Sequence, residues 1–302
     1  MLLLEEQPMT MTDLRTARIP ATGDKPRDDE LDLFGLTHPG KVRQENQDHF
    51  LLCTVHPQAV IHATSLPDPE SLPLRGERLA TVLLVADGVG GTSAGGEASL
   101  LAVEAITRYV TSTLRSYHAA SSADDEEFFE ALRAGVLEAD ALVRSEAAGR
   151  SQKTMATTLT LAIAVWPWLY VVQVGDSRCY YFWDGALRQV TRDQTMAQDL
   201  VDQGALPADR VASSPFSNVL ASAIGGPEPT PEVTRLDITR RGCVILLCSD
   251  GLTKHVPDAE IAEHLGAMHS AEQVCHALLD LALERGGSDN ITILVGRAPP
   301  SK

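Results

Sequence analysis

Short apolar runs that end in an aspartate recur along this chain, and they constrain its fold more than any other feature. Residues 83–91 read "LLVADGVGG", so an apolar run reaches Asp87 and glycine dominates the residues after it. Such a run is typical of a buried strand, and glycines let the backbone turn sharply and approach a small ligand closely. Taken alone, the stretch fits a site carboxylate and an ordinary Asp-Gly turn equally well.

Four further aspartates lie beside apolar runs in the same way. Two follow such a run and two stand just before one: Asp176, Asp250, Asp48 and Asp289. Each one alone reads as a turn former or a helix cap, but strand ends on one side of a sheet can converge. Converging carboxylates repel, so either their pKa values rise or hard cations neutralise them. A ligand set of oxygens without histidine or cysteine favours Mg²⁺ or Mn²⁺ over zinc.

Phosphoryl chemistry is the reaction class that such a cluster suits. Two ions bridged by a carboxylate acidify a water into a nucleophile and bind phosphate oxygens. Arg43 carries a planar fork of donors that suits a bidentate contact with a phosphate dianion. A surface ion pair with Glu45 or Asp48 is the alternative interpretation of Arg43.

Composition excludes several other classes of protein. The 302 residues carry a formal net charge of −16, which argues against binding to nucleic acid or to an anionic membrane. Hydrophobic residues make up 44% of the chain, enough for a sizeable core. The five cysteines lack metal-ligand spacing and read as free buried thiols. With no signal peptide and no apolar run near ~18 residues, the sequence predicts a cytoplasmic location.

The pattern along the chain predicts antiparallel sheets covered by helices. Residues 1–30 read as a flexible tail, and residues 56–78, with four prolines, read as a long loop. Apolar residues at helical spacing predict two pairs of helices, at 95–117 and 124–147 and at 258–269 and 271–287. Short β-branched and aromatic runs between residues 156 and 190 predict strands, with a hairpin turn at Asp184-Gly185.

Seven motifs in a fixed order then give a family resemblance. They are RxxNxD (Arg43, Asn46, Asp48), ADGVGG followed by GEAS, MATTL (155–159), VGDSRCY (174–180), TRDQ (191–194), LLCSDGL (246–252) and GGSDNIT (286–292). Together they resemble the metal-dependent serine/threonine protein phosphatase family, type 2C, in its compact bacterial form. The resemblance implies a phosphatase domain over residues 31–298. Its expected fold is α+β, a four-layer α-β-β-α sandwich of two mainly antiparallel sheets flanked by helix pairs.

The same resemblance assigns roles to residues. Asp87 would bridge two Mg²⁺ or Mn²⁺ ions, the Gly88 carbonyl would ligate one ion, and Asp250 with Asp289 would complete the other. Asp176 and Asp250 would hold a weaker third ion, and Arg43 would bind the substrate phosphate. Asp48 and Gln47 would support the metal ions. The nucleophile would be metal-bound water rather than a side chain. Residues 194–226 match the mobile flap beside the site.

Three residues depart from the pattern of that family. Gln47 stands where an acidic residue is usual, so metal affinity on that side is expected to be weaker. Val89 stands where some eukaryotic members carry a histidine that is proposed to protonate the leaving group. Gln194 stands where a histidine is common.

Two functions remain open from the sequence. The first is hydrolysis of phosphoserine and phosphothreonine in proteins by a monomeric enzyme that opposes a protein kinase, itself an expected substrate. The second is a catalytically silent, phosphatase-like regulatory module that binds phosphoprotein. Gln47 favours the second function, whereas the intact aspartates and Arg43 favour the first.

Overall fold

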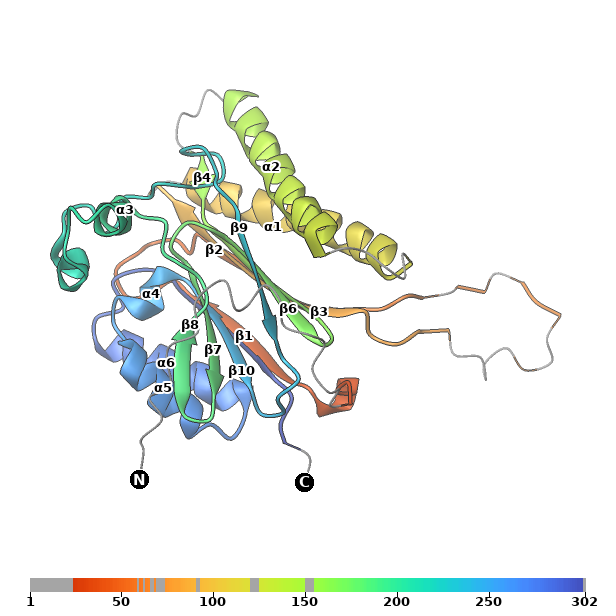
Figure 1. Ribbon diagram of the computed structural model, residues 1–302. Helices are drawn as coiled ribbons and strands as arrows, with labels where there is room; N and C mark the ends of the chain where they lie inside the picture. The colour runs from red at the N-terminus through yellow and green to blue at the C-terminus, as the bar shows by residue number, and fades with distance from the viewer. Residues whose placement is uncertain are drawn as a thin grey trace, which may run out of the picture.

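Two antiparallel sheets pack face to face and carry helices on both outer sides (Figure 1). The computed structural model describes residues 24–58, 60–61, 63–65, 68, 74–90, 93–119, 125–149 and 155–300. The α+β four-layer sandwich predicted from the sequence is confirmed.

The first sheet has five strands. Their order is β1 (Asp32–His38), β11 (Ile291–Arg297), β10 (Val244–Cys248), β7 (Arg178–Trp183) and β8 (Ala186–Gln189), and each neighbouring pair is antiparallel. β7 and β8 form the predicted hairpin. Asp184 and Gly185 take φ values of 50° and 77° at its turn, a left-handed conformation that asparagine, aspartate and glycine tolerate best.

The second sheet contains the remaining six strands. The order is β2 (Asp48–Val55), β3 (Ala80–Val89), β5 (Leu159–Val165), β6 (Trp168–Val174) and β9 (Glu232–Asp237), with the two-residue β4 (Ala156–Thr157) paired to the end of β3. Its outer face carries α1 (Ser93–Ala119) and α2 (Asp125–Gly149), while α5 (Asp258–Gly266) and α6 (Ala271–Glu284) cover the first sheet. Short helices α3 (Met196–Asp202) and α4 (Asp250–Thr253) and the 3₁₀ turns η2 (Asp28–Glu30) and η4 (Ala208–Ser213) complete the described chain.

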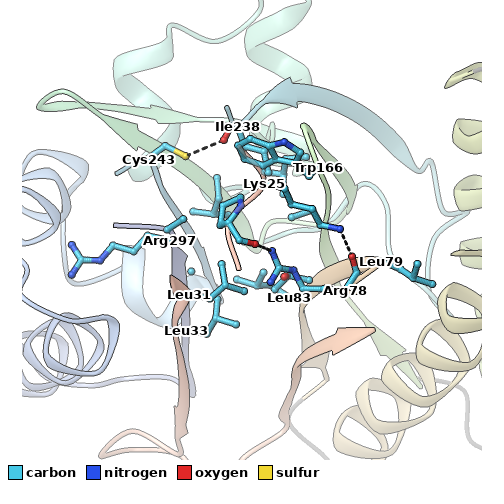
Figure 2. Close-up of a pocket in the computed structure, with 17 residues that line it drawn as sticks. Lys25, Leu31, Leu33, Arg78, Leu79, Leu83, Trp166, Ile238, Cys243 and Arg297 are labelled. Atoms are coloured by element: carbon cyan, nitrogen blue, oxygen red, sulfur yellow. Dashed lines mark hydrogen bonds between the residues drawn. The ribbon is translucent and has the colours of Figure 1, made fainter. Parts of the chain in front are cut away.

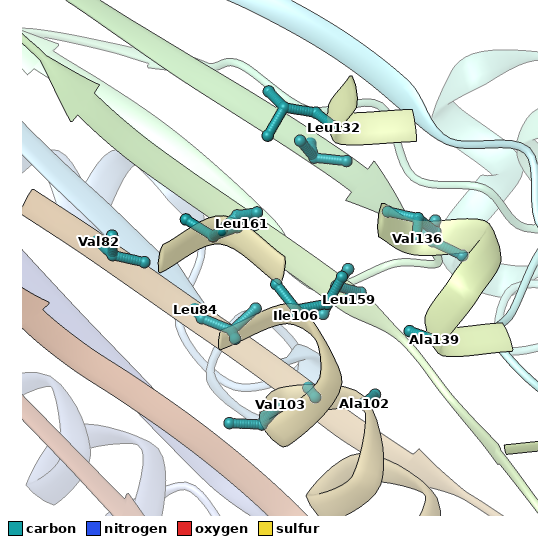
Figure 3. Packing of buried hydrophobic residues seen from close by; sticks show 14 of the residues in the cluster. Val82, Leu84, Ala102, Val103, Ile106, Leu132, Val136, Ala139, Leu159 and Leu161 are labelled. Atoms are coloured by element: carbon teal, nitrogen blue, oxygen red, sulfur yellow. The ribbon is translucent and has the colours of Figure 1, made fainter. Parts of the chain in front are cut away.

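The apolar run at 83–86 is continuous because β3 contributes to two cores at once. Val82 and Leu84 point toward the helices, where they pack with Ile106 and Leu161 (Figure 3). Leu83 belongs instead to the cluster between the two sheets. Successive side chains of a strand face opposite sides, so a strand that is covered on both sides needs apolar residues at every position.

The antiparallel pairing explains why the aspartates converge. β2 begins and β3 ends at one edge of the second sheet, where Asp48 lies directly opposite Asp87. β10 ends and β11 begins at one edge of the first sheet, so Asp250 and Asp289 come from adjacent strand ends. Asp176 follows the end of β6. All five therefore gather at one end of the sandwich, beside α4 (Figure 1).

The opposite end of the sandwich holds a separate apolar pocket of about 80 Å³ between the two sheets (Figure 2). Residues 24–30, which the sequence analysis assigned to a flexible tail, lie against this end. The buried Arg78 guanidinium donates to the Pro26 carbonyl and to the Asp28 carboxylate, and Lys25 donates to the Arg78 carbonyl. These hydrogen bonds fix the segment. Residues 1–23 of the predicted tail lie outside the described residues.

Helix α2 binds the C-terminal end of the 194–226 segment through hydrogen bonds. Buried Asp140 accepts a 2.7 Å hydrogen bond from the Gly225 amide and another of 2.7 Å from Arg144 Nε. Arg144 in turn donates to the Gly226 carbonyl at 2.9 Å. Gly225 has a φ of +76°, and a side chain there would meet the Met155 carbonyl. The Asp140 contact and the left-handed conformation of Gly225 together define the path of the chain here.

We expect Asp140→Ala to lower the free energy of unfolding by about 1–3 kcal/mol, because the Gly225 amide loses its buried acceptor. Urea denaturation followed by circular dichroism measures the change. Glu138→Ala, at an exposed position of the same helix, is the control and should change stability little. Equal stability of the two variants would contradict the role of Asp140.

Candidate active site

The convergent strand ends surround a cavity of about 200 Å³. Seven of the eight residues that the sequence placed at the site line it: Arg43, Gln47, Asp87, Gly88, Asp176, Asp250 and Asp289. The eighth, Asp48, is buried directly behind Asp87 in the paired strand. Residues up to 246 positions apart in sequence therefore form one polar site.

The end of β3 is held by hydrogen bonds between the Asp87 backbone and two threonine hydroxyls. The Asp87 amide donates to Thr158 Oγ1 at 3.0 Å, and the Asp87 carbonyl accepts from Thr157 Oγ1 at 2.9 Å. A Cβ on Gly88 would lie 2.4 Å from the Gly95 carbonyl oxygen, so glycine is required there. Thr157 and Thr158 are the two threonines of the MATTL motif. They are buried, but they also orient Asp87.

Asp48 is held by hydroxyl groups. Its Oδ2 accepts from Ser249 Oγ at 2.7 Å and from Thr292 Oγ1 at 2.6 Å. Its Oδ1 is buried and receives no hydrogen bond in the described part of the chain. Burial raises the pKa of Asp48 to about 6, against the opposing effect of the two hydroxyls. No local pattern predicts Ser249 and Thr292 as partners of Asp48, because both contacts span more than 200 residues.

The other buried carboxyl groups also resist ionisation. Burial raises the pKa of Asp87 well above its ordinary value, and the charges of Asp48 and Asp250 raise it further. Burial, followed by repulsion from Asp250, raises the pKa of Asp176 to about 8. Burial also raises the pKa of Asp250, although the ammonium group of Lys254 opposes that shift. At neutral pH the cluster must therefore keep protons or gain cations.

Two cationic side chains already lie at the cluster. Arg43 donates from Nε and Nη2 to the two oxygens of Asp289 at 2.8 and 2.9 Å. Lys254 Nζ lies 2.6 Å from Asp250 Oδ2 and 2.8 Å from Asp289 Oδ2. Burial favours a higher pKa for Asp289, but these hydrogen bonds outweigh burial and lower it.

The two cations bear differently on the sequence predictions. Arg43 was expected either to bind phosphate or to pair with Glu45 or Asp48. Its ion pair is with Asp289 rather than with Glu45 or Asp48, and its contact with phosphate stays a prediction. The sequence analysis missed Lys254. The available signal was its position four residues after Asp250, a spacing at which opposite charges meet on a helix.

The donor set fits Mg²⁺ or Mn²⁺. No group of three or more acidic, histidine or cysteine side chains in the described residues holds an ion-binding arrangement as the side chains stand. Two of the carboxylates are engaged by Arg43 and Lys254. Asp250 Oδ1 and Asp48 Oδ1, however, are buried oxygens that accept no hydrogen bond within the described ranges of the chain. Such oxygens need a cation or a proton, and hard divalent ions prefer oxygen ligands.

Two amide side chains hold the loops that carry site residues. Asn290 accepts from the Gln47 amide at 2.9 Å and donates to the carbonyls of Pro39 and Glu45. Gln194, where the family resemblance would expect a histidine, accepts from the Gly175 amide at 2.9 Å and donates to the Thr230 carbonyl. Gln194 thus fixes the loop that presents Asp176.

The segment at 194–226, which the sequence resemblance marks as a flap, forms part of the cavity wall. Asn218 and Leu220 line the cavity from this segment. Within the segment, the Met196 amide donates to the Val219 carbonyl, and the Ala221 amide donates to the Gln194 carbonyl. Residues 219–221 are thereby held against the start of α3. Its mobility remains a prediction.

A helix-flanked double sheet with acidic side chains converging at one edge defines a class of metal-dependent phosphatases. The model of the family described as protein phosphatase 2C matches residues 73–284. The chain belongs to this family.

Its relatives include the serine/threonine protein phosphatase PstP of Mycobacterium tuberculosis. The two sequences are 36% identical over 224 residues, which make up 72% of this chain and 40% of PstP. A solved structure of M. tuberculosis PstP is 29% identical, with a TM-score of 0.69, and covers 89% of this chain and 99% of the solved chain. A structure of the PstP catalytic domain with two manganese ions is 28% identical, with a TM-score of 0.65 and the same coverage. This chain thus spans 40% of the length of the curated PstP.

We expect the metal-free protein to lose stability as the pH rises from about 5 to about 8. A carboxyl group whose folded pKa exceeds its unfolded pKa binds more protons in the folded state, so the free energy of unfolding falls between the two pKa values. Asp48, with a pKa of about 6, and Asp176, with a pKa of about 8, both act in this window. Asp289, whose pKa is lowered, stays ionised in both states there.

Thermal unfolding in EDTA and in MnCl₂ across this range measures the effect. The free energy of unfolding should fall by up to about 1.4 kcal/mol per pH unit for each proton released. Mn²⁺ should reduce it, because the ions neutralise the same carboxylates. A melting temperature in EDTA that rises with pH would contradict the charge repulsion.

Proposed function

We propose that residues 31–298 hydrolyse phosphoserine and phosphothreonine in proteins. The observation that carries the proposal is the set of buried carboxylates around one polar cavity, with Arg43 at its rim, in a member of the protein phosphatase 2C family. Members of that family depend on metal ions, and the PstP catalytic domain is solved with two manganese ions. Two Mg²⁺ or Mn²⁺ ions are accordingly our proposed cofactors.

The residues divide into ion ligands and substrate contacts. Asp87 and the Gly88 carbonyl would hold one ion, and Asp87, Asp250 and Asp289 the other. Such a pair supplies an activated water and charge neutralisation for phosphate oxygens. No side chain of the cavity is required as a covalent nucleophile.

Arg43 is the proposed contact for the substrate phosphate. Its side chain is 47% exposed and already presents two parallel N–H donors to a carboxylate. A phosphate dianion offers the same pair of oxygens with more charge. An incoming phosphate can therefore replace Asp289 as the partner of Arg43 while Asp289 turns to an ion.

A silent, phosphoprotein-binding module is the second candidate function. The observation in its favour is Gln47, whose neutral amide lines the cavity where the family resemblance expects a carboxylate. The remaining acidic residues are in place, so we rank hydrolysis first.

The cellular setting follows from the same reasoning. The described helices include none that is both long and apolar enough to cross a bilayer. All five cysteines are free, which suits a reducing compartment. The free thiols support a proposed cytoplasmic location. We further propose that the protein acts as a monomer and that its substrates include a serine/threonine kinase.

We expect hydrolysis of a phosphothreonine peptide to require Mn²⁺ or Mg²⁺ and to stop on chelation. Asp87→Asn should reduce the rate by about 10³-fold or more, because it removes the charge that bridges the ions. The same variant should unfold at a higher temperature than the wild type in EDTA, since it relieves repulsion among buried carboxylates.

Asp184→Asn is the matched control, at the exposed hairpin turn where asparagine is tolerated. It should keep wild-type activity and metal dependence. Full activity after exhaustive chelation, or near-native turnover of Asp87→Asn in saturating Mn²⁺, would contradict the proposed chemistry.

We expect Gln47→Glu to lower the Mn²⁺ concentration for half-maximal activity about tenfold or more, with little change in kcat at saturation. A carboxylate at this position adds charge that attracts the ions, and ~1.4 kcal/mol suffices for a tenfold change. Gln44→Glu, at an exposed position three residues away, is the control. Activity that appears only in Gln47→Glu would favour the silent module, and coincident titration curves would show that Gln47 does not act on the ions.

A further inference from the structure

Lys254 lies within the carboxylate cluster, and the proposed reaction gives it no task. It comes from the C-terminal end of α4, one turn after Asp250, and lines the cavity. Its ammonium group contacts Asp250 Oδ2 and Asp289 Oδ2 at 2.6 and 2.8 Å. Its side chain is only 29% exposed. The lysine is therefore a cation held by the fold at the point where acidic side chains meet.

The two oxygens of Asp250 have separate surroundings. Oδ2 contacts Lys254, whereas Oδ1 is buried and receives no hydrogen bond from any residue that the structure describes. Oδ1 is therefore the oxygen that remains for an ion while Lys254 stays in contact with Oδ2. A second ion on the same carboxylate would need Oδ2, and there it would have to replace the ammonium group. Asp250 is thus arranged to serve one ion and one lysine.

Asp176 is the other carboxylate involved. It lines the same cavity as Asp250 and Lys254, and Lys254 Nζ lies 2.6 Å from Asp250 Oδ2. A divalent ion between Asp176 and Asp250 would lie close to the ammonium group and be repelled by it. The lysine therefore both neutralises this side of the cluster and excludes a competing cation.

We propose that Lys254 is a built-in cation that takes the place of a third metal ion between Asp176 and Asp250, so that the chain binds two ions. The proposal rests on the metal centre of the proposed function. Lys254 would then stand in place of the third ion that the family resemblance implied between Asp176 and Asp250.

The experiment counts Mn²⁺ ions bound to the whole chain by native mass spectrometry and follows binding by calorimetry with MnCl₂. We expect two ions on the wild type even at millimolar Mn²⁺. Lys254→Met and Lys254→Gln should each bind a third ion and bind the first two about tenfold more tightly, because the repelling charge is gone. Lys254→Arg keeps the charge and should stay at two ions.

Two further measurements separate the lysine from general effects. In EDTA, Lys254→Met should unfold at a lower temperature than wild type, since Asp250 and Asp289 lose a buried partner. Lys41→Met removes the same charge from an exposed position on a nearby loop and should change neither the ion count nor the apo stability.

Three ions on the wild type would overturn the proposal whatever the variants do, as would an unchanged count in a folded neutral variant. A phosphothreonine peptide assay on the same samples separates this result from the proposed function. Two ions on an inactive wild type would leave the lysine proposal standing and reject hydrolysis. Three ions on an active wild type would do the reverse.

Discussion

Repulsion among buried carboxylates at one end of the sandwich is the constraint to which the rest of the site responds. Asp87 lies opposite Asp48 across a strand pair, and Asp176 and Asp250 add charge from other strand ends. Isolated buried charges of like sign cannot persist in a low-dielectric interior. The fold therefore depends at this edge on protons, on basic side chains or on ions. A protein that needs ions there is poised to use them in chemistry.

Neutral groups hold the acidic residues in position while leaving their charge available. Hydroxyls of Ser249 and Thr292 orient Asp48, and Thr158 receives the Asp87 amide. Such donors fix geometry with modest effects on charge. The basic residues instead contact Asp250 and Asp289, at the more exposed side of the cluster. The site thus has neutral hydrogen-bonding groups on the inside and basic side chains toward the cavity.

The sequence predicted those features that depend on short-range pattern. Apolar alternation and turn residues gave the strands, the helix pairs and the Asp184-Gly185 hairpin, and the position of aspartates at strand ends gave the cavity lining. The Arg43–Asp289 pair and the Asp140–Gly225 bond escaped prediction because their partners lie 246 and 85 residues apart. Arg78 was missed for the same reason. Its contacts with residues 26 and 28 exist only once the sheets have formed.

The register between β2 and β3 ties catalytic geometry to folding itself. Each residue of β3 faces either the helices or the opposing sheet, and the same alternation decides which way Asp87 points. A slip of one residue would exchange the two faces of the strand along its whole length. It would turn the carboxylate away from its partners and, at the same time, place every apolar side chain of β3 in the wrong core. A chain that is misaligned at the site is therefore also misfolded, so a stably folded population with a scrambled metal centre should not accumulate.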